Sequence, residues 1–564
     1  MTGNASDLRQ LEPGRYDAVY ESFEWEIPET YNMAEAVCDR WATDRSAVAL
    51  YWENAAGDAE SYTFHELSRL SNRCANAFRD RGIDREDIVA IFLPTLPESL
   101  IVTLAGHKLG AINMPLYHLF APDGIADRLR DASPELIVTD ECGLEKLAEI
   151  DAPESLDVVV VRGDDGHGVA SDDGSETDTG PALDDRPIPF AELLADRSSS
   201  FDPVETSPAD PAQLFYTSGT TGDPKGVLHA HRYALGHRYV GQYMRDFHET
   251  DLLWHSGDLA WAGGFANLLE AWTLGMPIVK YDGKFDPERA LALLEAYGVT
   301  IFVTAPTALR QMMDLPRETI DSYDLSLRVV SAGGERVTPD MLEWAEERFD
   351  AFGTLGYGQT ECYSVGYPPL GDERAEKLGA LGKPLPGCEV TILDDDGNEL
   401  PAGEAGELAV ATDDNPTMSL EYFDRPAETE AVREGRWHRT GDSARIDDDG
   451  YVWYLGRRDD MIISSGYRIS PAEVESSLNA HPAVKEAAVV GVPDAERTNI
   501  VKAVLEPAAG VRPSGDLVEE LQEHVKSNLA RFQYPREIEF VDDLPKTITG
   551  KIKRNRLRDG GEAQ

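Results

Sequence analysis

The stretch of sequence best suited to chemistry runs from Tyr216 to Gly226 and reads Tyr-Thr-Ser-Gly-Thr-Thr-Gly-Asp-Pro-Lys-Gly. Its glycines and small hydroxylated residues let the backbone approach phosphate oxygens and offer N–H and O–H donors, and Lys225 adds a cation. No Gly-Lys-Ser/Thr closes it, so it is not a Walker phosphate loop. Because most Gly/Ser/Thr-rich loops are plain turns, composition alone is weak evidence for a phosphate site.

Other polar motifs follow in order along the chain. A carboxylate after a Thr-Gly turn, as at Asp442, suits a pair of hydroxyl groups, although an Asx turn is the plain alternative. Lys546, Lys551 and Lys553 lie within eight residues in a chain that has only 13 lysines. A compact ammonium can enter a narrow site and neutralise charge there, whereas the plain alternative is a solvated basic loop.

Six motifs in this order resemble the signatures of the adenylate-forming superfamily, which includes acyl-CoA synthetases, firefly-type luciferases and peptide-synthetase adenylation domains. They are the 216–226 loop, Ser331–Glu335, Tyr357–Glu361, Trp437–Asp442, Gly456–Asp460 with Ser465–Arg468, and Pro545–Lys551. The resemblance spans nearly the whole chain. It implies an AMP-forming acyl-CoA synthetase that uses ATP, Mg²⁺, coenzyme A and a small-molecule carboxylic acid.

The resemblance also implies roles for the residues of the nucleotide site. Thr360 would contact the α-phosphate, Glu361 would hold Mg²⁺, and Lys551 would be the catalytic cation of adenylation. Tyr357 would stack on adenine. The other residues expected to contact the nucleotide are Thr217, Ser218, Gly219, Thr220, Thr221, Gly222, Lys225, Gly333, Gly334, Glu335, Gly358, Gln359, Asp442 and Arg457.

Two half-reactions are expected, and in the family a rotation of the C-terminal domain exchanges them, with its pivot at the position of Asp459. The coenzyme A tunnel would be lined by Ser465, Gly466, Tyr467 and Arg468. The C-terminal sequence most resembles that of medium-chain acyl-CoA synthetases. This resemblance suggests Arg497, Lys526 and Tyr534 as further coenzyme A contacts. For these three, a surface salt bridge or a packing role is an equally good interpretation.

The acyl pocket is predicted from two positions. Acetate-activating members carry Trp where this chain has Gly358, so an acid longer than acetate is expected. Trp261, within residues 255–267, is the candidate to limit the depth of the pocket. The expected acid is short to medium in length, straight or branched, and aromatic acids stay open.

The elements that position these motifs alternate between helix and strand. In residues 62–94, Thr63 and Glu66 form a capping-box pattern, Gly82 ends the helix, and an apolar run at 88–93 reads as a buried strand. Asp-Gly turns predict hairpins within 390–403 and 444–457. The predicted fold is α/β with largely parallel sheets.

Two domains are predicted from where the pattern restarts. Residues 1–458 would form the large N-terminal domain of parallel-rich sheets, packed helices and a small β-barrel-like part. Residues 459–564 would form a small, mobile α+β domain. Residues 162–185, rich in Gly, Asp and Ser, read as a solvated surface loop.

The net charge of −51, from 103 acidic and 52 basic residues, disfavours nucleic acid and anionic lipid as partners. The many carboxylates of this chain repel one another, and concentrated salt screens that repulsion. The net charge therefore favours a halophilic source. With no signal peptide and no apolar run of membrane-spanning length, the chain is expected to be cytoplasmic and not membrane-inserted. The five spaced cysteines are expected to be free thiols. Oligomeric state is not predicted.

The sequence has three alternative interpretations. A peptide-synthetase module is disfavoured because no carrier domain follows, and luciferase activity because of the medium-chain match. A non-catalytic regulator that binds nucleotide or acyl-CoA would tolerate loss of Lys551 or Glu361, and both are present.

Overall fold

The computed structural model describes residues 15–152, 156–161, 188–217, 224–334, 337–464, 467–494, 497–530, 532–546 and 552–558. Contacts divide the chain into two compact units. The first comprises Met1–Glu376, Pro384–Glu389 and Thr412–Arg436, and the second comprises Lys377–Lys383, Val390–Ala411 and Trp437–Gln564. Each unit is described by itself. The division groups strands before residue 458 with the C-terminal part. The boundary at 458/459, predicted for a mobile C-terminal domain, stays a prediction.

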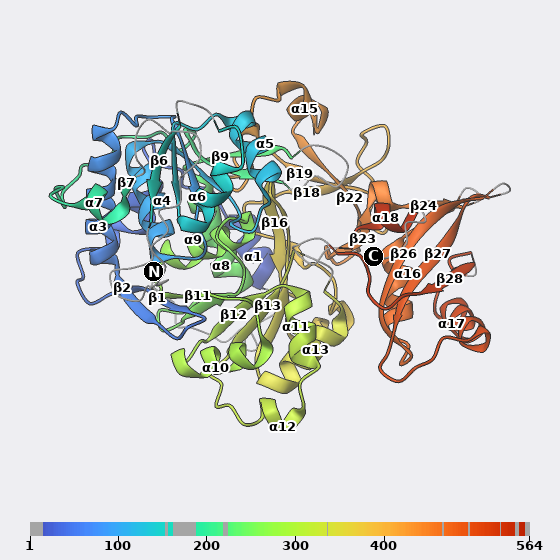
Figure 1. Ribbon diagram of the computed structural model, residues 1–564. Coiled ribbons are helices and arrows are strands. Elements are labelled where there is room, and N and C mark those ends of the chain that lie inside the picture. Colours follow the sequence, from blue (N-terminus) through green and yellow to red (C-terminus); the bar gives the residue numbers. More distant parts are fainter. Residues whose placement is uncertain are drawn as a thin grey trace. The chain divides into compact units, whose positions relative to one another are not determined.

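The first unit contains an eight-stranded sheet (Figure 1). Its strands are parallel from β8 to β7, and β9 and β20 extend it antiparallel at one edge. In sheet order they are β20 (Glu421–Tyr422), β9 (Gly226–Ala230), β8 (Pro211–Tyr216), β4 (Ile112–Pro115), β3 (Ile88–Phe92), β5 (Leu136–Thr139), β6 (Asp157–Val160) and β7 (Ile188–Pro189).

A seven-stranded sheet is the second framework of the first unit. All its neighbours are parallel except the hairpin of β1 and β2. In order its strands are β14 (Phe352–Leu355), β13 (Val329–Ala332), β12 (Ile301–Thr304), β10 (Leu253–His255), β11 (Ile278–Asp282), β1 (Val48–Asn54) and β2 (Ala59–Thr63).

Helices form a layer between these sheets and cover their outer faces. The inner layer holds α3 (Phe64–Asp80), α4 (Pro97–Leu109), α8 (Tyr233–Met244) and α9 (Ala262–Trp272), packed in one core with residues of both sheets. α5 (Pro122–Ala132) and α6 (Glu141–Ala148) cover the eight-stranded sheet. α10 (Pro287–Tyr297), α11 (Pro306–Met313) and α13 (Pro339–Phe349) cover the other.

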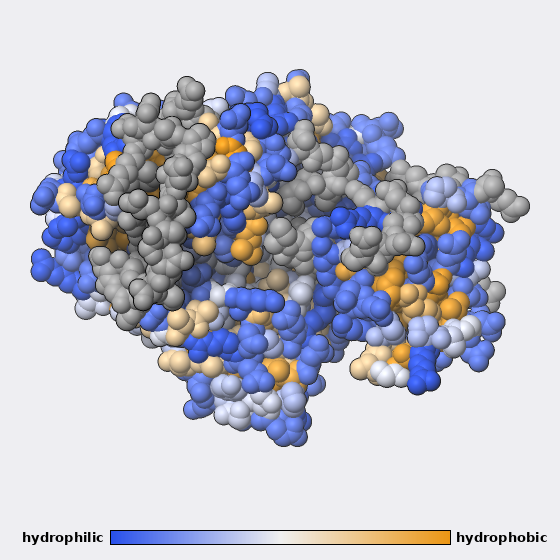
Figure 2. Space-filling view, in the orientation of Figure 1, coloured by the Kyte–Doolittle hydropathy of each residue, from blue (hydrophilic) through white to orange (hydrophobic). Residues whose placement is uncertain are grey.

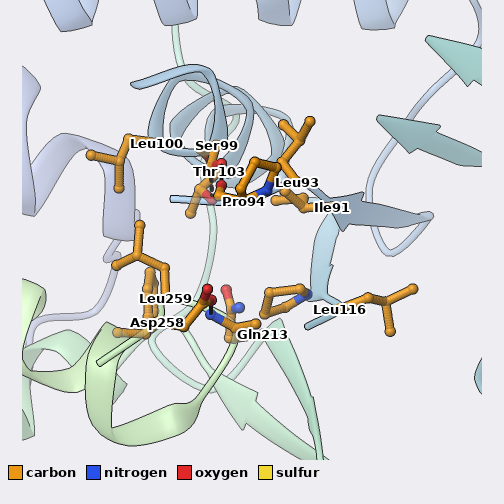
Figure 3. Close-up of a pocket in the computed structure, with 13 residues that line it drawn as sticks. Ile91, Leu93, Pro94, Ser99, Leu100, Thr103, Leu116, Gln213, Asp258 and Leu259 are labelled. Carbon is orange, nitrogen blue, oxygen red and sulfur yellow. Dashed lines mark hydrogen bonds between the residues drawn. The ribbon is translucent and has the colours of Figure 1, made fainter. Parts of the chain in front are cut away.

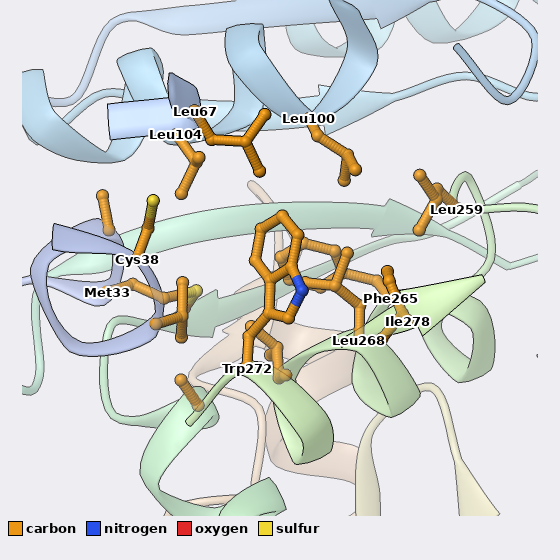
Figure 4. Close-up of a cluster of buried hydrophobic side chains, with 14 of the residues drawn as sticks. Met33, Cys38, Leu67, Leu100, Leu104, Leu259, Phe265, Leu268, Trp272 and Ile278 are labelled. Atoms are coloured by element: carbon orange, nitrogen blue, oxygen red, sulfur yellow. The ribbon is translucent and has the colours of Figure 1, made fainter. Parts of the chain in front are cut away.

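Trp272 lies at the centre of the inner core. Figure 4 shows its indole between Leu67, Leu100 and Leu104 on one side and Leu268 on the other. The indole N–H donates to the Ala49 carbonyl at 3.0 Å, so burial leaves no unpaired donor there.

Local signals in the sequence are confirmed in this unit. α3 begins with a capping box in which the Thr63 hydroxyl accepts from the Glu66 N–H and the Glu66 carboxylate accepts from the Thr63 N–H. The run at 88–93 forms β3, whose five residues are all buried. The predicted loop at 162–185 lies outside the described residues.

The second unit is built on antiparallel strands. β18 (Val390–Leu393), β19 (Ala405–Ala411), β22 (Trp437–Ile446) and β23 (Val452–Arg457) pair in that order. The hairpin predicted within 444–457 is confirmed, and the one predicted within 390–403 forms with its second strand farther along the chain, from Ala405. The short helix η4 (Arg458–Asp460) follows it.

A second sheet follows in the same unit, with order β25–β24–β27–β26 and β28 parallel to β27. Its core packs two helices against the long β26–β27 hairpin. The elements are β24 (Ile462–Ser464), β25 (Tyr467–Ile469), α16 (Pro471–Asn479), β26 (Val484–Asp494), β27 (Thr498–Pro507), α17 (Gly515–Asn528), β28 (Glu537–Phe540) and α18 (Arg554–Arg558).

The remaining elements are short. They are α1 (Arg15–Ser22), α2 (Met33–Val37), α7 (Phe190–Leu194), α12 (Arg317–Ile320), β15 (Tyr357–Gln359), β16 (Cys362–Tyr367), α14 (Arg374–Lys377), β17 (Lys383–Pro384), α15 (Pro426–Ala431) and β21 (Arg433–Glu434). The mixed α/β class is confirmed. In the part of the chain that the structure describes, no helix combines the length and apolar character needed to cross a bilayer. All five cysteines are free thiols, as expected.

Candidate active site

Two sequence motifs meet at one edge of the seven-stranded sheet. Gly333 and Gly334 follow β13, and Tyr357 comes just after β14, its parallel neighbour. Parallel α/β sheets bind ligands outside the carboxyl ends of their strands. Gly334 has φ +84°, which only glycine adopts easily, and the space beyond both glycines is open. Tyr357 itself is buried, and Glu335 lies outside the described residues.

The phosphate loop joins β8 to β9. Its central residues, Ser218 to Gly222, lie outside the described part of the chain, but both ends are placed. The Thr217 N–H donates to the Lys225 carbonyl at 2.9 Å, which closes the loop. The Lys225 ammonium lies 2.5 Å from a Glu428 carboxylate oxygen and 5.2 Å from the centre of the Tyr422 ring.

Thr360 and Glu361, in the turn between β15 and β16, are held by three other segments. The Thr360 carbonyl lies 2.7 Å from Nε2 of His229, the Glu361 carbonyl accepts from the Ser419 N–H at 2.8 Å, and Tyr422 donates to Glu361 Oε1 at 2.6 Å. Burial lowers the pKa of His229 to about 3. Its ring is therefore neutral, and Nε2 carries the proton because a carbonyl can only accept.

The donor set around Glu361 fits Mg²⁺ that arrives with a nucleotide. Among the described residues, no three His, Cys, Asp or Glu side chains gather as a metal cluster. Mg²⁺ is commonly bound by one or two carboxylates together with substrate phosphates. Glu361 is a single half-buried carboxylate with one oxygen engaged by Tyr422, as such a shared site requires.

Gly358 packs directly under an aromatic ring. A Cβ at this position would lie 2.3 Å from Cδ2 of Tyr363, its partner in the β15–β16 hairpin. The Tyr363 hydroxyl in turn lies 3.2 Å from the sulfur of Met244. Any side chain at residue 358 must therefore displace Tyr363, which gives glycine a packing role in addition to the predicted one. Gln359 is half-buried beside it.

Trp261 lies at the start of α9 among other aromatic residues. Its ring centroid is 5.3 Å from that of Tyr117 and 6.1 Å from that of Phe120, both in the loop after β4. A cavity of about 20 Å³ lies nearby, at the carboxyl ends of β3 and β4. Figure 3 shows Leu93 and Pro94 on one side of it and Asp258, Leu259 and Leu116 on the other. It has room for about one water molecule, so an alkyl chain would have to displace its walls.

Lys280 in β11 is a buried residue that sequence reasoning missed. Its ammonium donates to the Gly257 carbonyl at 3.2 Å, within the predicted acyl-pocket segment. Burial lowers the pKa of Lys280 to about 8, and the nearby Asp258 opposes that shift. The scarcity of lysine in this chain was the only available signal, and it does not say which lysines are buried.

The second unit carries the predicted ribose residues. Asp442 in β22 is buried, and its Oδ1 lies 3.3 Å from Arg457 and 3.4 Å from the Tyr454 hydroxyl. The structure thus brings Asp442 and Arg457 together. Glu407 in β19, which sequence reasoning also missed, accepts from the Gly441 N–H at 2.9 Å and so fixes the turn before Asp442.

Lys551 lies outside the described residues, but both flanks are held. Lys546 pairs with Ile552 across an isolated bridge, and its ammonium lies 2.5 Å from Glu486. After it, α18 is tied back to the segment of Asp459, because Arg558 lies 2.7 Å from the neighbouring Asp460. Asp459 itself lies in η4.

The candidate coenzyme A contacts are partly brought together. Lys526 lies 4.3 Å over the Tyr534 ring, and the Arg536 guanidinium lies 5.0 Å from the same ring. Lys526 also pairs with Glu523 at 2.6 Å. The backbone N–H of Arg497 donates to Asp494 Oδ1 at 2.9 Å. Ser465 and Gly466 lie outside the described residues, and Tyr467 and Arg468 are placed as backbone of β25.

Comparisons with known proteins show the family to which this chain belongs. Residues 35–423 match the family described as AMP-binding enzyme, and residues 473–551 match its C-terminal domain. The chain is 36% identical to acetyl-coenzyme A synthetase of Bacillus subtilis (strain 168), over 96% of this chain and 94% of the relative. It is 35% identical to the mitochondrial acyl-coenzyme A synthetase ACSM4 of Rattus norvegicus, over 94% and 91%.

A solved structure supports the same conclusion at the level of the fold. The anthranilate CoA ligase AuaEII, in complex with anthranoyl-AMP, matches with a TM-score of 0.83 and 28% identity, covering 95% of this chain and 98% of that one. With the family match extending over most of its length, this chain belongs to the AMP-binding enzyme family.

Proposed function

We propose that this AMP-forming acid–CoA ligase, which uses ATP, coenzyme A and Mg²⁺, activates a carboxylic acid longer than acetate. One observation supports the adenylation site best. Contacts from His229, Ser419 and Tyr422 converge on Thr360–Glu361, and Tyr422 also borders Lys225 of the phosphate loop. Groups expected to bind the triphosphate and its metal are therefore held together within the first unit.

The chemistry requires two displacements. A carboxylate oxygen of the acid attacks the α-phosphorus of ATP, and diphosphate is the leaving group. Glu361 would hold Mg²⁺, which would neutralise the charge of the leaving diphosphate. Lys225 and the loop donors hold the β- and γ-phosphates, Thr360 contacts the α-phosphate, and Lys551 neutralises charge between acid and phosphate. The coenzyme A sulfur then attacks the acyl carbonyl, and AMP leaves with the electron pair of the mixed anhydride.

Residues of the second unit complete the proposal. Asp442 and Arg457 bind ribose, and Glu407 keeps the Asp442 turn in place. Coenzyme A runs along Ser465–Arg468, and Lys526 and Tyr534, which lie together, meet its phosphates or adenine. Arg497 is a further contact. Asp459 is the pivot between the two half-reactions.

The preference for a longer acid rests on Gly358 and Trp261. Acetate-activating members of the family carry Trp at the position of Gly358, where this chain instead packs the Tyr363 ring, and Trp261 with its aromatic neighbours limits depth. The relative from Bacillus is named for acetate, and the AuaEII structure holds an aromatic acyl-adenylate. Acetate and aromatic acids are therefore the competing substrates.

The test is coenzyme A-dependent AMP release with straight acids of two to eight carbons, a branched acid and benzoate, in molar KCl. A rate of AMP release that is highest for an acid of more than two carbons supports the proposal. A rate that is highest for acetate or benzoate would identify that acid as the substrate instead. Binding of ATP without AMP release for any acid would favour the non-catalytic regulator. We also propose a cytoplasmic location in a high-salt cell, on the strength of the net charge.

A further inference from the structure

The segment from Glu421 to Ala431, here called the strap, lies against both ends of the phosphate loop. It consists of β20 and α15. β20 pairs with β9 immediately after the loop, with Tyr422 opposite Val227. The strap is nearly 200 residues from the loop in sequence, and none of the motifs described above includes it.

Two contacts of the Tyr422 side chain bear on the site. Its hydroxyl donates to Glu361 Oε1 at 2.6 Å, and the face of its ring borders the Lys225 ammonium at 5.2 Å. A phenol hydroxyl that donates to one oxygen of a carboxylate restricts rotation of the carboxylate. The other carboxylate oxygen can then bind a cation. An aromatic face attracts an ammonium within about 6 Å. One side chain therefore restrains both charged groups.

The rest of the strap joins the far end of the loop. Glu428 pairs with Lys225 at 2.5 Å and with Arg425 at 3.3 Å, and Arg425 lies 3.2 Å from Asp131. Asp131 accepts from the Tyr216 hydroxyl at 2.7 Å, just before the loop begins. Alternating charges thus run from one end of the loop to the other through the strap.

We propose that Tyr422 is a positioning residue that orients Glu361 for Mg²⁺ and Lys225 for the triphosphate, with Glu428 holding Lys225 until a nucleotide arrives. The inference rests on the proposed function and adds a residue that acts through two others. Its two contacts are separable by substitution, because Tyr422→Phe removes the hydroxyl and keeps the ring, whereas Tyr422→Leu removes both.

The experiment measures ATP binding by calorimetry in molar KCl, once with Mg²⁺ and once with EDTA, together with the urea midpoint of unfolding. Tyr297→Phe is the matched control, because its hydroxyl donates to Glu53 at 2.7 Å elsewhere in the first unit. We expect Tyr422→Phe to weaken Mg²⁺-dependent ATP binding about tenfold and to leave binding in EDTA unchanged. Tyr422→Leu should also weaken binding in EDTA, about threefold.

Four results overturn the inference. The first is that Tyr422→Phe binds Mg-ATP as the unsubstituted protein does. The second is that it loses affinity equally with and without Mg²⁺ while its urea midpoint falls, which indicates a structural role. An equal loss in Tyr297→Phe would show that the effect is not local. If the unsubstituted protein itself bound no ATP, the proposed function would fall and this inference with it. Normal adenylation by the unsubstituted protein separates the two failures.

Discussion

The two units differ in how they carry charge. The larger has 75 acidic and 32 basic side chains over 407 residues, whereas the smaller has 28 and 20 over 157. Their net charges are therefore −43 and −8. Eight of the 13 lysines belong to the smaller unit. Figure 2 shows a mostly hydrophilic face in agreement with this composition.

The difference indicates two ways of binding anions in an acidic protein. On the proposed function, the larger unit would bind anions through loop hydroxyls, glycine N–H groups and Lys225, and the neutral, buried His229 holds the Thr360 carbonyl nearby. The smaller unit gathers cations, as at Lys526 and Arg536 around Tyr534. A compact ammonium that must reach polyanionic substrates is thus concentrated where repulsion is lowest.

As pH falls, the larger unit should unfold before the smaller one. Burial lowers the pKa of four histidines in this unit to about 3: His107, His229, His231 and His255. The unfolded chain, with histidine pKa near 6.5, binds more protons between pH 6.5 and 3, so stability falls as pH drops through that range. Four such groups amount to roughly 5 kcal/mol per pH unit at most.

Hydrogen exchange at pH 7 and pH 5 measures this effect by segment. We expect 88–92 of β3 to lose protection while 484–507 of the β26–β27 hairpin keeps it. Equal protection of both segments at pH 5 would remove the distinction between the units.

Lys551→Ala should separate the half-reactions. Loss of a cation that stabilises the adenylation transition state should lower acyl-AMP formation about a thousandfold. Conversion of a supplied acyl-adenylate to acyl-CoA should persist, because Lys551 is expected to act in one arrangement only. Diphosphate exchange and thioester formation are the measurements, and Lys553→Ala is the neighbouring control. Equal loss of diphosphate exchange and of thioester formation in Lys551→Ala would contradict the assignment.

Low salt should destabilise the larger unit more than the smaller. Repulsion between carboxylates acts over about 10 Å at 0.1 M salt and about 3 Å at 1 M. Lowering KCl from 2 M to 0.1 M should reduce protection of 88–92 well before that of 484–507. A melting temperature that does not change with salt would refute the halophilic interpretation.

Gly358→Ala should have the smallest effect, a loss of about 1–3 kcal/mol of stability, because the new methyl group must displace Tyr363. Gly263→Ala is the control, since a Cβ there meets nothing within 4 Å. Urea unfolding in molar KCl compares them. If both variants are equally stable, Tyr363 yields freely, and Gly358→Trp becomes a clean test of a shift towards acetate.

What the sequence could predict was local. The capping box of Thr63 and Glu66, the buried β3 and the two Asp-Gly hairpins each depend on a few adjacent residues. The family motifs are recognisable because their residues and their order along the chain are distinctive. Thr360, Glu361 and Lys225 were named in this way, and the structure adds the contacts that hold them.

What it could not predict depends on distant partners. Tyr422, Glu407 and Lys280 lie in ordinary strand sequences, and only tertiary pairing brings them to Glu361, Gly441 and Gly257. The packing of Tyr363 on Gly358 depends on an irregular register in the β15–β16 hairpin. The grouping of β18 to β23 with the C-terminal part likewise follows from contacts that periodicity does not encode.

The pairing of β20 with β9 also has a consequence for folding. Val227 and Tyr422 become neighbours only after nearly 200 intervening residues have been ordered, and such non-local contacts form slowly because loop closure precedes any gain. During refolding, the eight-stranded sheet should therefore acquire its parallel core before its edge. The ability to bind nucleotide should appear as the last and slowest phase, well after most secondary structure has returned.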